Sequence, residues 1–243
     1  MDGTLIAGST ITEENKAAIR YFQAEGGKFT VCSGRNYTHF DKFREAFLPN
    51  APICAYNGAL IVDTDGKVLS ESFLGADALS AAGEIIKSGV FTNRFVIYTK
   101  ENGDPCDCDM TDFVENPEKY EAMHHYKLVF VGASEEETLR GQKLAAKLLP
   151  EGYSAVRSWP VGLEILKNSA SKGKALNFMK SRLGARLAVA AGDYENDAEM
   201  ITAADIGYAV ENAVPSVKAI ADRITVSAKE SAIAKIIEEL GSE

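Results

Sequence analysis

The apolar and polar positions in the first third of the chain switch between a helical period and a strand period. Thr12, followed by two glutamates, is typical of a helix start, and Gly26-Gly27 of a helix stop. Short β-rich runs bounded by turn residues are typical of strands. The pattern predicts a helix over 12–25, a strand over 28–32, a helix over 37–48, a strand over 52–56 and a hairpin of 59–63 with 67–72.

The same alternation returns in the last third of the chain. It predicts a helix over 171–183, a strand over 186–191, a helix over 197–203, strands over 206–210 and 224–226, and a helix over 229–240. Strands that alternate with helices of this length indicate a parallel sheet with helices on both faces. We therefore expect an α/β fold with a three-layer, doubly wound (Rossmann-like) core.

The middle of the chain has a different pattern, with strands that follow one another more closely. It predicts strands over 95–98, 127–131, 153–157 and 163–166, and helices over 76–88 and 135–149. This order is typical of a mixed α+β module. We expect it to be an inserted cap over 75–167, between the two core segments 1–74 and 168–243.

Composition and charge narrow the classes of function. The chain has 243 residues, with 26 basic and 35 acidic side chains and a net charge of −9. An acidic surface repels the nucleic-acid backbone, so no nucleic-acid partner is expected. No apolar run reaches the roughly 18 residues of a membrane span, and no signal peptide is visible, so we expect no membrane partner and a cytoplasmic location.

Cysteines and histidines give no metal pattern. The spacing of Cys106 and Cys108 is not that of a usual zinc pair, and no second pair matches it. Cys32 and Cys54 lie in apolar runs and are expected to be buried. His124 and His125 are adjacent, so their side chains point in different directions, and we expect an exposed pair rather than a metal site.

Four short motifs carry the chemistry of the chain. They are Asp2-Gly3-Thr4-Leu5 at the start, Ser33-Gly34-Arg35 after a strand, Lys172 at a helix start and Gly192-Asp193-Tyr194-Glu195-Asn196-Asp197 after another strand. Each is expected at the carboxyl end of a parallel strand or at a helix start, where ligands bind in open α/β sheets.

Phosphoryl transfer requires these residue types together. A carboxylate can attack phosphorus, and water then clears the aspartyl-phosphate. Carboxylates also hold Mg²⁺, a hard cation that prefers oxygen ligands. Lysine and backbone amides can neutralise the charge that develops on the phosphoryl oxygens.

In this order the motifs resemble the haloacid dehalogenase superfamily, and in detail its Cof-type sugar-phosphatase branch with a large inserted cap. The resemblance implies a magnesium-dependent phosphatase of small phosphorylated metabolites, chiefly sugar phosphates. It implies that Asp2 is the general acid/base, that Ser33 and Lys172 bind the phosphate, and that Asp193 is a metal ligand. The implied catalytic residues are Asp2, Ser33, Lys172 and Asp193, the implied phosphate-binding residues Gly3, Gly34, Arg35, Asn57 and Asn196, and the implied Mg²⁺ ligands Asp2, Asp193, Asn196 and Asp197.

The chain departs from the family pattern at its first motif. That pattern reads Asp-x-Asp-Gly-Thr, and its nucleophile lies two residues before the acid/base. In this chain the position falls before Met1, together with the apolar strand that carries it. We therefore expect a truncated first core strand, a nucleophilic aspartate upstream of Met1 and impaired catalysis by the chain as printed. The unfilled place in the sheet is expected to weaken stability or to promote strand exchange.

Two alternatives remain beside the phosphatase. One is a catalytically inert protein that binds magnesium or a phosphorylated metabolite. The other is a phosphotransferase or mutase of the same superfamily, which passes the phosphoryl group to a second hydroxyl instead of to water. The sequence gives neither the specific substrate nor the oligomeric state.

Overall fold

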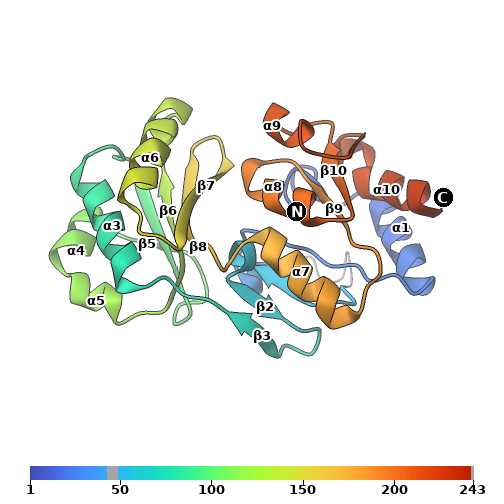
Figure 1. Cartoon of the computed structure of the whole chain (residues 1–243), viewed down its shortest axis with the longest axis horizontal. Coiled ribbons are helices and arrows are strands. Elements are labelled where there is room, and N and C mark those ends of the chain that lie inside the picture. Colours follow the sequence, from blue (N-terminus) through green and yellow to red (C-terminus); the bar gives the residue numbers. More distant parts are fainter. Residues whose placement is uncertain (43–48, 242–243) are drawn as a thin grey trace.

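The computed structural model describes residues 1–42 and 49–241, which form two lobes side by side (Figure 1). The core lobe contains α1 (Glu13–Ala24), η1 (Tyr37–Lys42), β1 (Ile53–Ala55), η2 (Tyr56–Gly58), β2 (Leu60–Val62), β3 (Val68–Glu71), α7 (Lys172–Leu183), β9 (Val189–Gly192), η3 (Glu195–Asp197), α8 (Ala198–Ala203), β10 (Ile206–Val210), α9 (Pro215–Lys218), β11 (Arg223–Thr225), η4 (Ala228–Glu230) and α10 (Ala232–Gly241). The inserted lobe contains α3 (Ala76–Lys87), β4 (Arg94–Thr99), β5 (Cys106–Asp107), α4 (Met110–Glu115), α5 (Pro117–Glu121), β6 (His125–Val131), α6 (Glu135–Leu148), β7 (Tyr153–Trp159) and β8 (Gly162–Lys167).

The helices of the core lobe begin and end where capping chemistry predicts. The Thr12 side chain accepts a hydrogen bond from the amide of Asn15 at the start of α1. Ser171 caps α7 in the same way, and Gly184 ends α7 in the left-handed conformation at φ 59°. Helices α1 and α10 lie side by side (Figure 1), and Asn15 Oδ1 accepts from the Ala234 amide at 2.8 Å. The helices predicted near the two ends of the chain are thus confirmed, and a hydrogen bond joins them.

The parallel strands expected in the last third are confirmed. Strand β10 lies between β9 and β11, and both pairings are parallel, with Ile206 opposite Val189 and Tyr208 opposite Arg223. The hairpin of β2 and β3 is antiparallel, as predicted, and pairs further with β1. These core strands form two separate three-stranded sheets, and no strand of the described residues joins them. The α/β class is confirmed.

The prediction of a strand over 28–32 is wrong in its extent. Only Cys32 forms a bridge, parallel to Cys54. The Phe29 amide donates to the Asn50 side chain at 2.8 Å, so a side chain replaces the neighbouring strand there. The predicted helix over 37–48 begins as the 3₁₀ helix η1 at Tyr37–Lys42, and its remainder, residues 43–48, lies outside the described residues.

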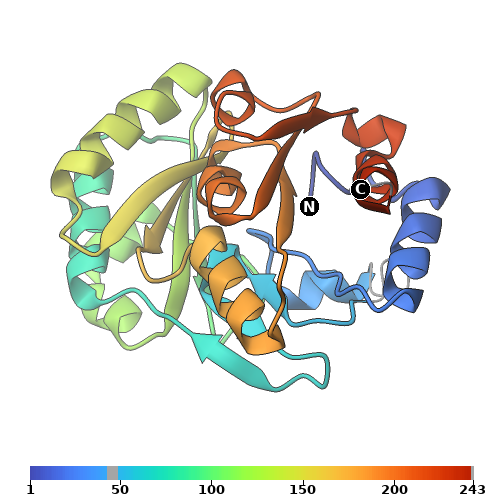
Figure 2. The ribbon, with the colours of Figure 1, turned by 45° about the vertical axis from the view of Figure 1, so that its right-hand side comes forward.

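The inserted lobe is a five-stranded antiparallel sheet in the order β5-β4-β6-β8-β7. Helices α3 to α6 cover one face, and the other face is turned toward the core lobe (Figures 1 and 2). Phe130 stacks between Phe91 and Phe95, with ring centroids 4.9 and 4.7 Å away, under the helices. The sequence pattern missed β5, α4 and α5, which are too short to show a period.

Two strands of this lobe present polar side chains to the core lobe. On β8, Leu163 and Ile165 belong to the apolar cluster under the helices, so Glu164 between them faces the opposite way. On β6, Lys127 lies before the buried Leu128 in the same manner. Both charged side chains are buried, because the core lobe covers that face of the sheet.

The expected exposed histidine pair is right for His124 only. His125 is fully buried, and its Nε2 lies 2.8 Å from the Tyr120 carbonyl. Among the described cysteines Cys54 is buried as expected and Cys32 is half-buried, with the two sulfurs 2.7 Å apart. No helix of the described residues is long and apolar enough to cross a membrane.

Candidate active site

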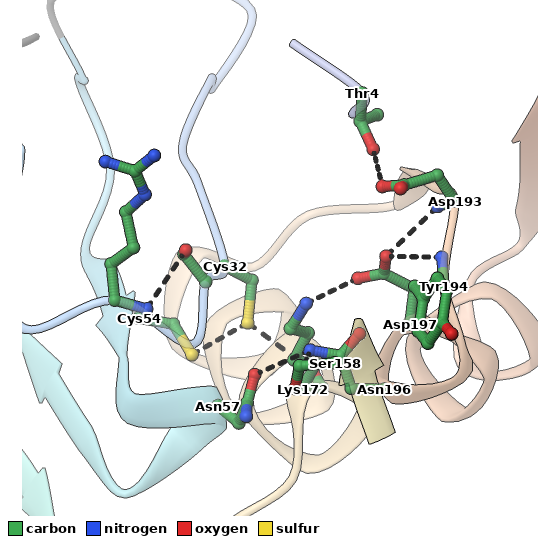
Figure 3. A network of polar contacts seen from close by, with 12 residues as sticks. Thr4, Cys32, Cys54, Asn57, Ser158, Lys172, Asp193, Tyr194, Asn196 and Asp197 are labelled. Carbon is green, nitrogen blue, oxygen red and sulfur yellow. Dashed lines mark hydrogen bonds and ion pairs between the residues drawn. The ribbon is translucent and has the colours of Figure 1, made fainter. Parts of the chain in front are cut away.

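The first motif forms a tight turn against the loop that follows β9. Two backbone amides of the turn donate to the Met1 carbonyl at 2.9 Å. Gly3 has φ +70°, and a Cβ at this position would overlap the Asp193 carboxylate. The Thr4 hydroxyl donates to Asp193 Oδ1 at 2.7 Å (Figure 3). Only glycine fits the second position of this turn, because it needs both a positive φ and no side chain.

A buried ion pair lies beside that turn. Lys172 Nζ, at the first residue of α7, is 2.6 Å from Asp197 Oδ1, and both side chains are only 4% exposed (Figure 3). The second oxygen of Asp197 accepts hydrogen bonds from the backbone amides of Asp193 at 3.0 Å and Tyr194 at 3.3 Å. The Asp197 carboxylate therefore orients the lysine and closes its own loop at the same time.

Burial and charge act in opposite directions on these groups. Burial lowers the pKa of Lys172, but the charge and hydrogen bond of Asp197, together with Cys32 and Asp193, outweigh it and leave the pKa raised. Burial raises the pKa of Asp197, but Lys172 outweighs it and leaves the pKa lowered. Both side chains therefore stay charged. The pKa of Asp193 is raised, by burial first and by the neighbouring Asp197 second, and the Thr4 hydrogen bond offsets this only in part.

The second motif follows the bridge at Cys32. Ser33 is buried, and its hydroxyl accepts from the Arg35 amide at 3.2 Å. The Arg35 guanidinium donates to both carboxylate oxygens of Asp2, with Nε 2.6 Å from Oδ2. Burial alone would raise the pKa of Asp2, but the hydrogen bond from Arg35 and the nearby positive charge lower it. Asp2 and Arg35 thus form a two-pronged ion pair across the two motifs.

Two asparagines connect the second and fourth motifs. Asn57 lies in η2 with φ 57°, a conformation that asparagine tolerates better than most residues. The backbone amide of Asn57 donates to the Ser33 carbonyl at 2.8 Å. Asn196 Nδ2 donates to Asn57 Oδ1 at 3.2 Å and to Ser158 Oγ, on the inserted lobe, at 2.9 Å (Figure 3). The side chains expected around a phosphate therefore lie in one connected group.

The residues expected to bind Mg²⁺ are not gathered into one ligand set. Among residues 1–42 and 49–241, no three His, Cys, Asp or Glu side chains lie together as a metal site. Asp2 is paired with Arg35, and Asp197 with Lys172. Asp193 does fit a cation, because its half-buried carboxylate is repelled by the neighbouring Asp197, which contributes to its raised pKa, and a hard cation would relieve that repulsion.

A cavity of about 470 Å³ opens between the lobes beside this group. Asn57, Lys172 and Asn196 line it from the core lobe, and Ser154 and Val156 line it from β7 of the inserted lobe. Three of the residues predicted to bind phosphate thus border a space between the lobes, whereas Gly3, Ser33, Gly34 and Arg35 are not among its lining residues.

The sequence pattern missed the charged residues that the inserted lobe contributes. Lys127 Nζ donates to the Gly34 carbonyl at 2.7 Å, and Glu164 accepts from Asn57 Nδ2 at 2.7 Å. Arg157 donates to both carboxylate oxygens of Glu195 in η3. The available signal was a lone charge between apolar neighbours on a buried strand, as in Leu163-Glu164-Ile165.

Comparisons with known proteins agree with this arrangement. The family model described as haloacid dehalogenase-like hydrolase matches residues 1–237. The chain is 31% identical to YxeH of Bacillus subtilis over 264 aligned residues, covering 99% of this chain and 96% of that protein. It is 26% identical to YcsE of the same organism, a 5-amino-6-(5-phospho-D-ribitylamino)uracil phosphatase, over 98% of this chain and 92% of the relative.

Solved structures share the fold over the whole chain. A sugar phosphatase of haloacid dehalogenase subclass IIB superposes with a TM-score of 0.82 at 20% identity, covering 99% of this chain and 96% of that one. A haloacid dehalogenase-like hydrolase from B. subtilis gives a TM-score of 0.82 at 22% identity, covering 98% of this chain and 96% of that chain. At these identities the similarity concerns the fold.

Proposed function

The chain belongs to the haloacid dehalogenase-like hydrolases, a family of phosphohydrolases, and on that premise we propose that it hydrolyses phosphate monoesters of small metabolites, sugar phosphates first. The observation that carries the proposal is the buried Lys172–Asp197 pair. Lys172 feels the charge of the nearby Asp193 and borders the cavity between the lobes. A buried ammonium held in place by a carboxylate is suited to neutralise phosphoryl oxygens.

Each motif has a proposed role in this reaction. Lys172 and the Ser33 hydroxyl bind the phosphoryl oxygens. Asp2 transfers the proton to the leaving oxygen and later takes one from water; because Arg35 lowers the pKa of this carboxyl, their ion pair has to open before Asp2 can carry the proton. Asp193 and Asn196 hold Mg²⁺, which supplies charge neutralisation when bound. The family pattern Asp-x-Asp-Gly-Thr has its nucleophilic aspartate two residues before the acid/base, so the test below supplies an aspartate at that position.

The two lobes have separate proposed tasks. Residues 1–74 and 168–243 form the catalytic core, and residues 75–167 form a cap that selects the substrate. The proposal is supported by the five-stranded sheet and helices α3 to α6, all of which fall between Ala76 and Lys167. The cavity wall supplied by Ser154 and Val156 gives this cap direct access to a bound metabolite.

The test is phosphate release from a panel of sugar phosphates with Mg²⁺. It compares the chain as printed with a version that carries a short apolar segment and Asp ahead of Met1. We expect turnover in the extended version only, and its loss on Asp193→Asn. Turnover in neither version, with Mg²⁺ still bound, would favour the inert binding protein. Transfer to a second hydroxyl without phosphate release would identify a phosphotransferase.

A further inference from the structure

A fully buried ion pair lies where the inserted lobe meets the second motif. Lys127 Nζ on β6 is 2.7 Å from Glu164 Oε2 on β8, and both side chains are 2% exposed. Removing two charges from water costs several kcal/mol per ion by order of magnitude, and their attraction rarely returns much more than this. A hydrophobic pair of the same size would fill the space at less cost. The pair therefore calls for a reason other than stability.

The remaining hydrogen bonds of this pair go to the core lobe. Lys127 Nζ donates to the Gly34 carbonyl at 2.7 Å, across 93 residues of sequence. Glu164 Oε2 accepts from Asn57 Nδ2 at 2.7 Å, across 107 residues. The Tyr98 ring, with its centroid 4.4 Å from Nζ, completes the surroundings of the ammonium. The two charges are fully satisfied only while the inserted lobe is seated on the core.

These contacts hold the phosphate-binding segment itself. A fixed Gly34 carbonyl fixes the peptide plane whose other end is the Arg35 amide, the donor to Ser33 Oγ. Glu164 accepts a hydrogen bond from Asn57 Nδ2. This orients the Asn57 side chain so that its Oδ1 accepts from Asn196. Loss of either contact would free the second motif and η2 to move.

We infer that Lys127 and Glu164 are positioning residues, which make the geometry of the phosphate site depend on seating of the inserted lobe. The inference rests on the proposed function for its ligand, a phosphoryl group. It adds that the site is complete only in the closed arrangement, and that two residues remote from the four motifs set its affinity.

The variants Lys127→Met and Glu164→Gln test this. The first readout needs no ligand and is hydrogen exchange at the amides of Tyr56 and Asn57, which donate to the Arg35 and Ser33 carbonyls. We expect both variants to exchange on the order of tenfold faster there, since each removes or weakens a hydrogen bond to a charged group that holds this segment. Lys87→Met, an exposed lysine paired within α3, should leave these amides unchanged.

The second readout is the affinity for inorganic phosphate with Mg²⁺, measured by calorimetry. We expect a loss on the order of tenfold in both variants, and no larger loss in the double variant, because the pair acts as a unit. A second control, Phe113→Leu, loosens the apolar cluster of the inserted lobe and should lower the melting temperature without changing the affinity.

Each outcome decides a separate claim. Unchanged exchange at Tyr56 and Asn57 in a folded variant overturns the positioning role. Faster exchange with unchanged phosphate affinity overturns its link to the site. A wild-type chain that binds no phosphate counts against the proposed function, and the exchange result then decides the positioning role alone. If Lys127→Met does not fold, Glu164→Gln, which has nearly the same shape as the native residue, carries the test.

Discussion

Single residues at the site combine a local role with a long-range partner. Lys172 starts α7 and at the same time neutralises Asp197, which is 25 residues away in sequence. Gly3 has no side chain, and this leaves room for the Asp193 carboxylate that lies against the first turn. The sequence identifies both residues as chemically interesting, whereas the fold determines what each of them touches.

Removal of the Lys172 ammonium should be costly to the fold. Lys172→Met leaves Asp197 as a buried carboxylate with only backbone donors, so we expect the free energy of unfolding to fall by about 3–5 kcal/mol. Urea denaturation measures the loss. Lys180→Met on the same helix removes a more exposed pair with Asp205 and should change stability little. Equal stability of the two variants would contradict the importance of the buried pair.

His125 should make stability depend on pH. Because a carbonyl only accepts hydrogen bonds, Nε2 carries the proton toward Tyr120, while Nδ1 is buried and has no hydrogen-bond partner among the described residues. Burial lowers the pKa of His125, so below about pH 6.5 the unfolded chain binds more protons than the folded one and stability falls.

The measurement is the melting temperature at about pH 7.5 and about pH 5.5, on either side of the ordinary histidine pKa. We expect His125→Gln, which cannot titrate, to reduce the drop seen in the wild type. Lys87→Met, which removes an exposed lysine that does not titrate in this range, should leave the drop unchanged. An identical drop in wild type and His125→Gln would show that other groups cause it.

Elements were predictable where their own residues carry the signal. Helix α1 follows from Thr12 and the two glycines after it, and the β2–β3 hairpin from its central turn. The strand expected over 28–32 failed because the Asn50 side chain takes the place of a neighbouring strand at Phe29. Short elements such as β5, with two residues, hold too few positions to show a period.

Strand β7 carries a contact between the lobes that a substitution can test. Arg157 is 11% exposed and binds Glu195 of η3 with two nitrogens, while a third nitrogen reaches Glu135 at 2.8 Å. We expect Arg157→Met to lower the free energy of unfolding by about 1–3 kcal/mol in urea denaturation. Arg157→Lys keeps the positive charge but cannot form two parallel hydrogen bonds to Glu195, so its loss of stability should lie between those of the wild type and Arg157→Met. Full recovery by lysine would refute the two-pronged geometry.

At the scale of the whole molecule, the lobes are held together from several sides. Asp104, in the loop after β4, accepts from Asn36 and Thr38 of the core lobe. Tyr126 of β6 stacks on Tyr56 of η2 with ring centroids 4.4 Å apart. The closed arrangement is therefore a distributed property, and no single contact is expected to open it.

Loss of two contacts between the lobes, those of Asp104 and Arg157, should change the shape of the molecule. We expect Asp104→Ala combined with Arg157→Met to increase the radius of gyration in small-angle X-ray scattering, because the lobes then separate more often. Each single variant should keep the wild-type radius of gyration, because the other contacts then still hold the lobes together. A double variant with the wild-type radius would mean that the remaining contacts hold the lobes closed.

The sequence by itself determined the local structure of the core and the four motifs. Periodicity and capping residues act within a few positions, so α1, α7 and the parallel strands β9 and β10 could be predicted from their own residues. The order of the motifs sufficed for the resemblance that the family match then confirmed.

Only the tertiary structure decided how the site is completed. Strand alternation says that Glu164 points away from Leu163 and Ile165, but not what lies on that side of the sheet. Its partner Asn57 is 107 residues away, and Gly34 is 93 residues from Lys127. Contacts over such distances depend on how the two lobes dock, and no local pattern of residues encodes that docking.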